Sequence, residues 1–158
     1  MIQMGDKSYQ CTGPMLRQIG ANHGLYNLKN PAEMYRADSA CDVYFDIFNQ
    51  CGKINFAPTD EAKKAALDQL MNQIIPNSFK FLENRLSKLN VKYVSGDNLC
   101  YADFCWASFM VTVALNSNFP FSGGIQMQMA MYPKTKQYLE RMKEVVAPYV
   151  AVRLPRPF

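Results

Sequence analysis

The pattern of apolar and polar residues divides the chain into a short β-containing start and a long helical remainder. Residues 1–4 and 7–10 flank Gly5-Asp6, a pair that favours a tight turn, so these two segments predict a β-hairpin. From Pro31 onward, apolar residues recur at the helical intervals of three, four and seven positions. The first such stripe consists of Met34, Cys41, Phe45 and Phe48. The chain is therefore predicted to be mainly α-helical.

The first predicted helix follows the hairpin directly. Thr12 is a suitable N-cap, and Pro14 suits the first turn because its missing N–H would have no partner there. The helix is predicted to run from Pro14 to Asn22, and Gly24 favours a left-handed ending. A helix start with free N–H groups beside a hydroxyl is a potential anion site.

Three further stretches are predicted to be helical. Residues 60–89 form a long one, which Pro76 kinks or restarts. Residues 104–115 form an uncharged apolar run that is too short to span a bilayer, so it is predicted to be a buried core helix. An amphipathic helix begins at Pro133.

Composition favours one main domain and excludes some functions. A chain of 158 residues that is 49% hydrophobic can bury one sizeable core. Its formal net charge of +4 lies in residues 132–158, where six Lys or Arg outnumber two Glu. Such a stretch is typical of a solvated face, and it lacks the dense basic patch and the recognisable module of a nucleic-acid-binding protein.

The five cysteines point to reduced thiols rather than to a metal site. No C-x-x-C pair is present and His23 is the only histidine, so no metal is expected. Residues 1–10 lack the basic start and apolar core of a signal peptide. A cytoplasmic protein is therefore expected.

The segment GDNLCYADFCW, residues 96–106, carries the most specific pattern. Asp103 comes three residues after Cys100, the spacing of a capping box in which the acidic side chain accepts a hydrogen bond from the cap N–H. This segment resembles the G-x-x-x-[Ser/Thr]-x-A-D pattern that starts the core helix in the C-terminal domain of cytosolic glutathione transferases. Cys100 stands where that family has Ser or Thr.

The resemblance covers most of the chain and implies a fold. Residues 1–28 resemble the last two strands and last helix of the family's thioredoxin-like domain, and residues 29–158 resemble its helical domain. The expected fold is mainly α, an all-helical glutathione-transferase C-terminal domain preceded by a partial thioredoxin-like β-β-α segment. The sigma class is nearest, judged by ADFCW at 102–106 and by the acidic residues of the helix after Pro31.

The resemblance also implies what the chain lacks. In the family, a Tyr or Ser hydroxyl from the first half of the thioredoxin-like domain holds the thiol of glutathione as a thiolate. No residue here matches that donor. We therefore expect the first half of that domain to be missing, and no catalytic residue is assigned.

Three residues are expected, by resemblance, to bind glutathione as a co-substrate. Cys11 and Thr12 stand where the family has Gln followed by Ser or Thr, the pair that holds the γ-glutamyl end. The Thr12 hydroxyl suits a carboxylate, although Thr12 could also be a helix cap alone. Cys11 departs from the pattern because a thiol cannot replace both the donor and the acceptor of an amide. Asp46 matches the position that reaches the α-amino group of glutathione across a dimer.

Four other residues match further positions of the family. Phe45 and Phe48 correspond to the lining of an apolar substrate pocket, with plain core packing as the alternative. Arg17 and Asp42 correspond to dimer-interface positions, with a solvated surface charge as the alternative. A homodimer or an assembly subunit is expected, without nucleic acid or membrane, because the exposed hairpin should pair with a second copy or another subunit.

Two functions follow from these observations. The first is a glutathione transferase that conjugates or isomerises small apolar electrophiles with glutathione, if the thiol-activating part is supplied. The second is a non-catalytic structural or assembly subunit that has lost that half-domain.

Overall fold

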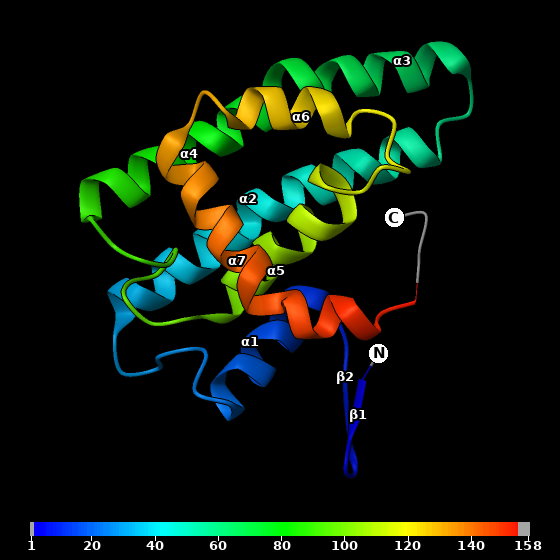
Figure 1. Cartoon of the computed structure of the whole chain (residues 1–158). Helices are drawn as coiled ribbons and strands as arrows, with labels where there is room; N and C mark the ends of the chain where they lie inside the picture. The colour runs from blue at the N-terminus through cyan, green and yellow to red at the C-terminus, as the bar shows by residue number, and fades with distance from the viewer. Residues whose placement is uncertain (1, 155–158) are drawn as a thin grey trace.

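The computed structural model describes residues 2–154, a helical body that carries a two-stranded sheet at one end (Figure 1). Residue Met1, which was predicted to belong to the first strand, lies outside the described residues. In order, the elements are β1 (Ile2–Met4), β2 (Lys7–Tyr9), α1 (Thr12–Asn22), α2 (Pro31–Asn55), α3 (Asp60–Gln69), η1 (Leu70–Ile74), α4 (Ile75–Leu89), α5 (Tyr101–Phe109), η2 (Met110–Ala114), α6 (Ser122–Met129) and α7 (Pro133–Val152). The expected fold, a helical domain after a β-β-α segment, is confirmed.

The predicted hairpin is present. β1 and β2 pair antiparallel, with Ile2 opposite Tyr9 and Gln3 opposite Ser8. Gly5 has a φ of 64°, a left-handed conformation that the turn requires and that glycine adopts without steric cost. Gln10 lies outside the strand, so β2 is one residue shorter than expected.

Helix α2 is the longest element, and a well-formed cap starts it. The side chain of Asn30 accepts hydrogen bonds from the N–H groups of Ala32 and Glu33, and Pro31 occupies the first turn. The predicted apolar stripe is only partly correct, since Cys41 is buried whereas Phe48 is 59% exposed. The buried face consists of Ala37, Ala40, Cys41, Ile47, Gln50, Cys51 and Ile54.

Pro76 restarts the long helical stretch, as predicted. The chain runs from α3 through a single π-helical turn, η1, and then into α4, with Pro76 in the first turn of α4. The π register shifts the backbone hydrogen bonds by one residue, because the N–H of Ile75 reaches the carbonyl of Leu70. The missing N–H of proline is thereby accommodated without ending the helical path.

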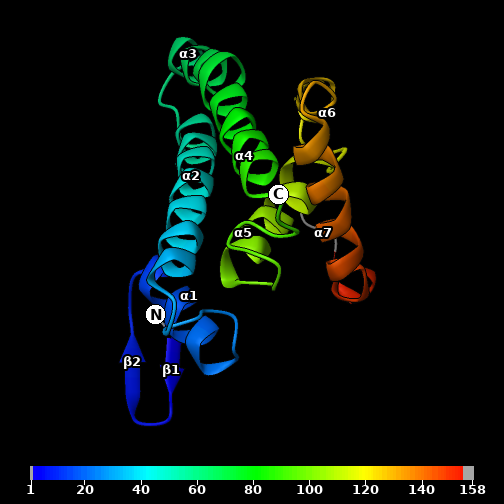
Figure 2. The same ribbon diagram turned by 90° about the vertical axis from the view of Figure 1, so that its left-hand side faces the viewer.

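The core is built around α5, which lies between α2 and α7 in both ribbon views (Figures 1 and 2). Helix α5 begins at Tyr101, three residues before the predicted apolar run, and continues into the π-helical turn η2. Trp106 is fully buried and donates from Nε1 to the carbonyl of Ala40 on α2, at 3.1 Å. This hydrogen bond fixes how closely the two helices approach.

The predicted capping box at Asp103 is confirmed, and it extends further than the pattern alone indicated. Asp103 is 0% exposed, and its Oδ2 accepts from the N–H of Cys100 at 2.8 Å. Its Oδ1 accepts from the N–H of Val94 at 3.1 Å and from the hydroxyl of Tyr138 on α7 at 2.8 Å. One carboxylate therefore ties the start of α5 to the preceding loop and to α7. Within residues 2–154, no helix is both long and apolar enough to cross a membrane.

Candidate functional site

The corner between β2 and α1 is built on an unusual backbone conformation. Cys11 has φ 67° and ψ 119°, a positive φ that costs a non-glycine residue of order 1 kcal/mol or more. Helix α1 begins at Thr12, so the prediction that Thr12 is the N-cap was wrong; the cap position belongs to Cys11, without a side-chain cap hydrogen bond. Cys11 and Thr12 are both exposed, and Pro14 follows them in the first turn.

This geometry leaves donors at the helix start. The side chain of Cys11 makes no cap bond. The N–H groups of Thr12 and Gly13 precede the first helical hydrogen bond, which runs from Met15 to the carbonyl of Cys11 at 3.1 Å, and Pro14 has no N–H. The positive end of the helix dipole lies at the same place. The corner is therefore suited to an anionic group such as a carboxylate, with the Thr12 hydroxyl as a further donor. Binding of glutathione at Cys11 and Thr12 stays a prediction.

A carboxylate on α2 connects the β-β-α segment to the helical body. Asp38 accepts hydrogen bonds from the hydroxyls of Tyr26, at 2.9 Å, and Tyr101, at 2.6 Å. Arg17 on α1 lies 3.6 Å from the same carboxylate. Gly20 of α1 packs beside Tyr101, and a Cβ at Gly20 would come within 3.1 Å of the Tyr101 Cβ. These four side chains, Arg17, Tyr26, Asp38 and Tyr101, are called the Asp38 cluster below.

Electrostatics within the Asp38 cluster favour protonated tyrosines and a charged arginine. Burial and the hydrogen bond to Asp38 raise the pKa of Tyr26 to about 12. The same two causes raise the pKa of Tyr101. Burial lowers the pKa of Arg17, but the carboxylate of Asp38 and the two tyrosines outweigh it, so that pKa is raised overall. The cluster therefore holds its hydrogen bonds over the whole neutral range.

The three aspartates spaced four residues apart on α2, Asp38, Asp42 and Asp46, have different surroundings. Asp38 is half-buried and has partners on α1 and α5, whereas Asp42 and Asp46 are exposed. Arg17 makes an ion pair within its own chain. The assignments of Arg17 and Asp42 to a dimer interface remain predictions. Sequence reasoning missed the roles of Tyr26 and Tyr101, because their partner lies 12 and 63 residues away along the chain.

Asp46 lines a cavity between α2 and α4 that mixes polar side chains with apolar ones such as Val43 and Phe81. The cavity has a volume of about 580 Å³. Its lining includes Asp46, Asn49, Gln50, Lys53, Asn77 and Ser78. Lys53 supplies the opposite charge to Asp46 within this lining. The contact of Asp46 with the α-amino group of glutathione across a dimer stays a prediction.

Phe48 lines a separate, more apolar cavity between α2 and α5. This cavity has a volume of about 300 Å³. Its lining includes Tyr44, Ile47, Phe48, Cys51, Phe56 and Phe109. Phe45 is half-buried, and its ring packs 6.4 Å from the ring of Phe48. The structure thus gives Phe48 the geometry of a pocket residue and gives Phe45 that of a supporting core residue; the pocket role of both stays a prediction.

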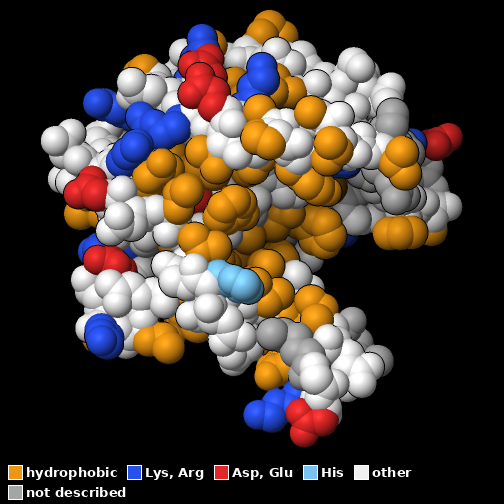
Figure 3. Space-filling view, turned by 60° about the horizontal axis from the view of Figure 1, so that its bottom comes forward, with side chains coloured by type: hydrophobic (Ala, Val, Ile, Leu, Met, Phe, Trp, Pro, Cys, Tyr) orange, Lys and Arg blue, Asp and Glu red, His pale blue; other side chains and the backbone are white. Residues whose placement is uncertain are grey.

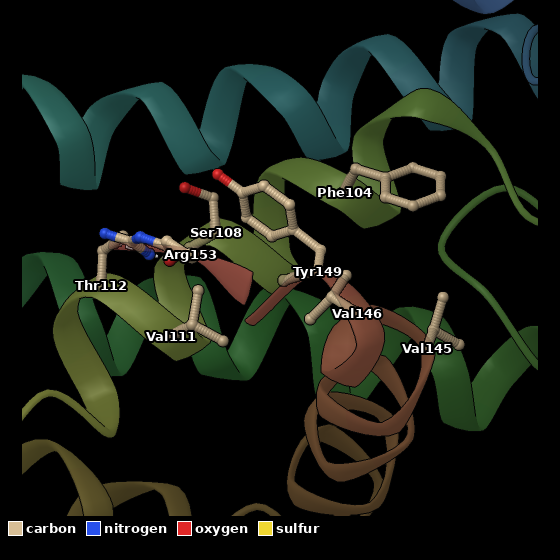
Figure 4. A pocket seen from close by; sticks show the side chains of 9 residues that line it. Phe104, Ser108, Val111, Thr112, Val145, Val146, Tyr149 and Arg153 are labelled. Carbon is tan, nitrogen blue, oxygen red and sulfur yellow. Dashed lines mark hydrogen bonds between the residues drawn. The ribbon is translucent and has the colours of Figure 1, made fainter. Parts of the chain in front are cut away.

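A third groove runs between α5 and the end of α7, and sequence reasoning did not anticipate it (Figure 4). It has a volume of about 650 Å³, with Phe104, Val111, Val145 and Val146 among its apolar lining. In Figure 4, the hydroxyl of Tyr149 points towards Ser108, and Arg153 reaches beside Thr112. Ser108 and Thr112 also line the cavity of Phe48, so the two apolar spaces share a wall.

One face of the molecule is hollowed and carries many apolar side chains. Figure 3 shows hydrophobic side chains gathered around a hollow between the helical body and the hairpin arm. Among the residues that the structure describes, no three His, Cys, Asp or Glu side chains come together in a way that could hold a metal ion.

Comparison with known proteins identifies the helical part. Residues 45–152 match the family model of the glutathione S-transferase C-terminal domain. None of the curated proteins matches the chain.

Several solved structures share the fold. The glutathione S-transferase Blo t 8 superposes with a TM-score of 0.79 at 22% identity, covering 95% of this chain and 66% of that one. The glutathione S-transferase of Ascaris lumbricoides gives 0.77 at 20%, covering 99% and 74%. Prostaglandin synthase D of Nilaparvata lugens gives 0.74 at 17%, covering 97% and 73%. The chain thus spans about two thirds to three quarters of the length of these proteins.

Proposed function

Since the chain belongs to the glutathione S-transferase family through its helical C-terminal domain, we propose that it binds glutathione and a small apolar electrophile. The observation that carries this proposal is the corner at Cys11 and Thr12, where a strained backbone presents a hydroxyl and free helix N–H groups to an anion. The similar structures are glutathione S-transferases or, in one case, a prostaglandin synthase. Either conjugation or isomerisation of an apolar substrate is consistent with them.

The residues divide this work between the two charged groups of the γ-glutamyl end of glutathione. The α-carboxylate of this residue binds at Thr12, with its charge stabilised by the N-terminus of α1. Its α-amino group binds Asp46 of a second copy in a cytoplasmic homodimer, in which Arg17 and Asp42 lie at the interface. The apolar co-substrate occupies the cavity lined by Phe48, with Phe45 behind it.

Catalysis itself needs one further group, and we assign that role to no residue within 2–154. Conjugation requires the thiol of glutathione to lose its proton, and a hydroxyl donor stabilises the resulting thiolate. Glutathione in this proposal is a co-substrate, and the residues named above position it without activating it.

A second function, that of a non-catalytic assembly subunit, is supported by a specific observation. Cys11 stands at the strained corner, where the family carries a glutamine amide, and a thiol makes weaker and fewer hydrogen bonds than an amide. Such a protein would bind glutathione weakly or not at all, and it would not turn over substrate.

Calorimetric titration with glutathione tests the binding site. Thr12→Ala should weaken binding by about tenfold or more, because a hydrogen bond to a charged group contributes about 1.5–3 kcal/mol. Cys11→Gln should strengthen it by restoring the amide. Ser8→Ala, which removes an exposed hydroxyl on β2, is the matched control and should leave affinity unchanged.

Turnover of an aryl halide electrophile then separates the two functions. Turnover that is lost in Thr12→Ala supports the transferase. Weak or undetectable glutathione binding together with no turnover supports the non-catalytic subunit. The glutathione site is refuted if no binding is detected at millimolar glutathione in either the wild type or Cys11→Gln.

A further inference from the structure

Two buried thiols face one another across the interface of α2 and α5. The Sγ atoms of Cys41 and Cys105 lie 3.8 Å apart, and the residues are 2% and 6% exposed. A disulfide has an S–S distance of about 2.05 Å, so each sulfur would have to move by only about 1 Å. Within residues 2–154, no other two of the five cysteines have a hydrogen bond between their sulfur atoms.

The packing of the two helices holds these thiols in place. Cys41 follows Ala40, and Cys105 precedes Trp106; Trp106 donates to the carbonyl of Ala40 at 3.1 Å. The hydrogen bond therefore fixes the backbone next to each cysteine. The two sulfurs are aligned by the core itself rather than by a chance approach of mobile side chains.

The two sulfurs differ chemically. The hydrogen bond between the two thiols lowers the pKa of Cys41 against the effect of burial. The hydrogen bond with Cys41 and burial raise the pKa of Cys105. Cys41 thus has the character of the attacking sulfur, and Cys105 that of the second, resolving thiol.

The remaining cysteines lack this arrangement. Burial raises the pKa of Cys51 to about 11 and that of Cys100 to about 12, so both are less reactive. Cys11 is exposed at the corner before α1. The pair differs from all three in having both a partner sulfur and a polarised proton.

We propose that Cys41 and Cys105 form a modification site, at which a small hydroperoxide converts the dithiol into a disulfide that links α2 to α5. The Cys41 thiolate attacks one peroxide oxygen, the O–O bond breaks, and an alcohol or water leaves as Cys41 becomes a sulfenic acid. Cys105 then attacks this sulfur, the S–O bond breaks, and water leaves with the Cys105 proton. Two thiols are oxidised and one hydroperoxide is reduced.

The bond would close a loop between positions that are 64 residues apart in sequence. Such a loop restricts the unfolded chain, so the oxidised protein should melt about 5 °C or more above the reduced one. This proposal does not depend on the proposed binding of glutathione, because neither cysteine belongs to that site.

Thiol counting in denaturant tests the proposal directly. Cys11→Ser serves as the parent protein, because Cys11 is exposed and would react separately. After treatment of the folded parent with millimolar hydrogen peroxide, alkylation in denaturant should count two thiols where the untreated parent has four. The intact mass should fall by two hydrogens, and dithiothreitol should reverse both changes.

Peptide mapping must separate the cysteines. Trypsin leaves Cys41 with Cys51 on the peptide 37–53, and Cys100 with Cys105 on the peptide 93–134. Cys51→Ser and Cys100→Ser in the parent should therefore keep the linked peptides, whereas Cys41→Ser and Cys105→Ser should abolish them.

The opposite results overturn the proposal. It fails if the parent, still folded by circular dichroism, keeps four thiols after peroxide treatment. It also fails if Cys105→Ser still loses two thiols, or if the linked peptides require Cys51 or Cys100.

Discussion

The helical body and the β-β-α segment use polar side chains in opposite ways. In the helical body, Asp103 is fully buried and is satisfied by two backbone N–H groups and one tyrosine hydroxyl. In the β-β-α segment, the side chains at the strained corner are exposed and have no comparable network. A buried, satisfied network specifies structure, whereas exposed donors at a helix start are available for a ligand.

The Asp38 cluster lies between these extremes. Asp38 is half-buried and joins α1 to α2 and α5 through Arg17, Tyr26 and Tyr101. The segment that carries the candidate ligand corner is therefore attached to the body by a partly solvated polar contact. Binding at the corner and stability of the body are expected to be separable by mutation.

Loss of Asp103 should have the largest effect. Asp103→Ala leaves the N–H groups of Val94 and Cys100 and the hydroxyl of Tyr138 buried without their acceptor. We expect the free energy of unfolding to fall by about 3–4 kcal/mol, measured by urea denaturation. Asp97→Ala, an exposed acidic residue in the same loop, should change it by no more than about 0.5 kcal/mol. A loss below about 1 kcal/mol for Asp103→Ala would contradict the role given to this network.

Loss of the charge at Asp38 should have a smaller effect. Asp38→Asn removes the ion pair with Arg17 and weakens the hydrogen bonds from Tyr26 and Tyr101. Because the cluster is partly solvated, we expect a loss of about 1–2 kcal/mol, with amide hydrogen exchange rising first in α1. Asp46→Asn, on the exposed part of the same helix, is the control for stability. Equal losses for the two variants would argue against the cluster as the joint between the regions.

High pH should destabilise the Asp38 cluster, and this is the smallest of the three expected effects on stability. The pKa of Tyr26 is raised from 10.0 to about 12 in the folded protein, so the unfolded chain loses that proton first as pH rises. The contribution of protonated Tyr26 to the stability of the fold is fully present below pH 10, declines between pH 10 and about 12, and is lost above that range. Tyr26→Phe should therefore make the decline in melting temperature over this window shallower. An identical decline in the wild type and the variant would show that Tyr26 is not linked to it.

Local patterns predicted most of the helical body. The capping box at Asp103, the restart at Pro76 and the hairpin at Gly5 are each determined by residues close together in sequence, and the structure confirms all three. The prediction of the first helix start from cap propensities was wrong, because Cys11 has an unusual backbone conformation. Thr12 is a better cap residue than Cys11 by propensity, yet the positive φ of Cys11 moves the helix start. The division of the chain at residue 28 stays a prediction.

The sequence by itself determined the family resemblance, the helical periodicity and the residue types at the corner, because these depend on short-range spacing. Only the tertiary structure decided that Asp38 rather than Asp42 or Asp46 holds Arg17, that Phe48 faces a cavity while Phe45 supports it, and that Cys41 meets Cys105. The reason is that each of these contacts joins different elements. Their geometry depends on how the helices pack, which no local pattern specifies.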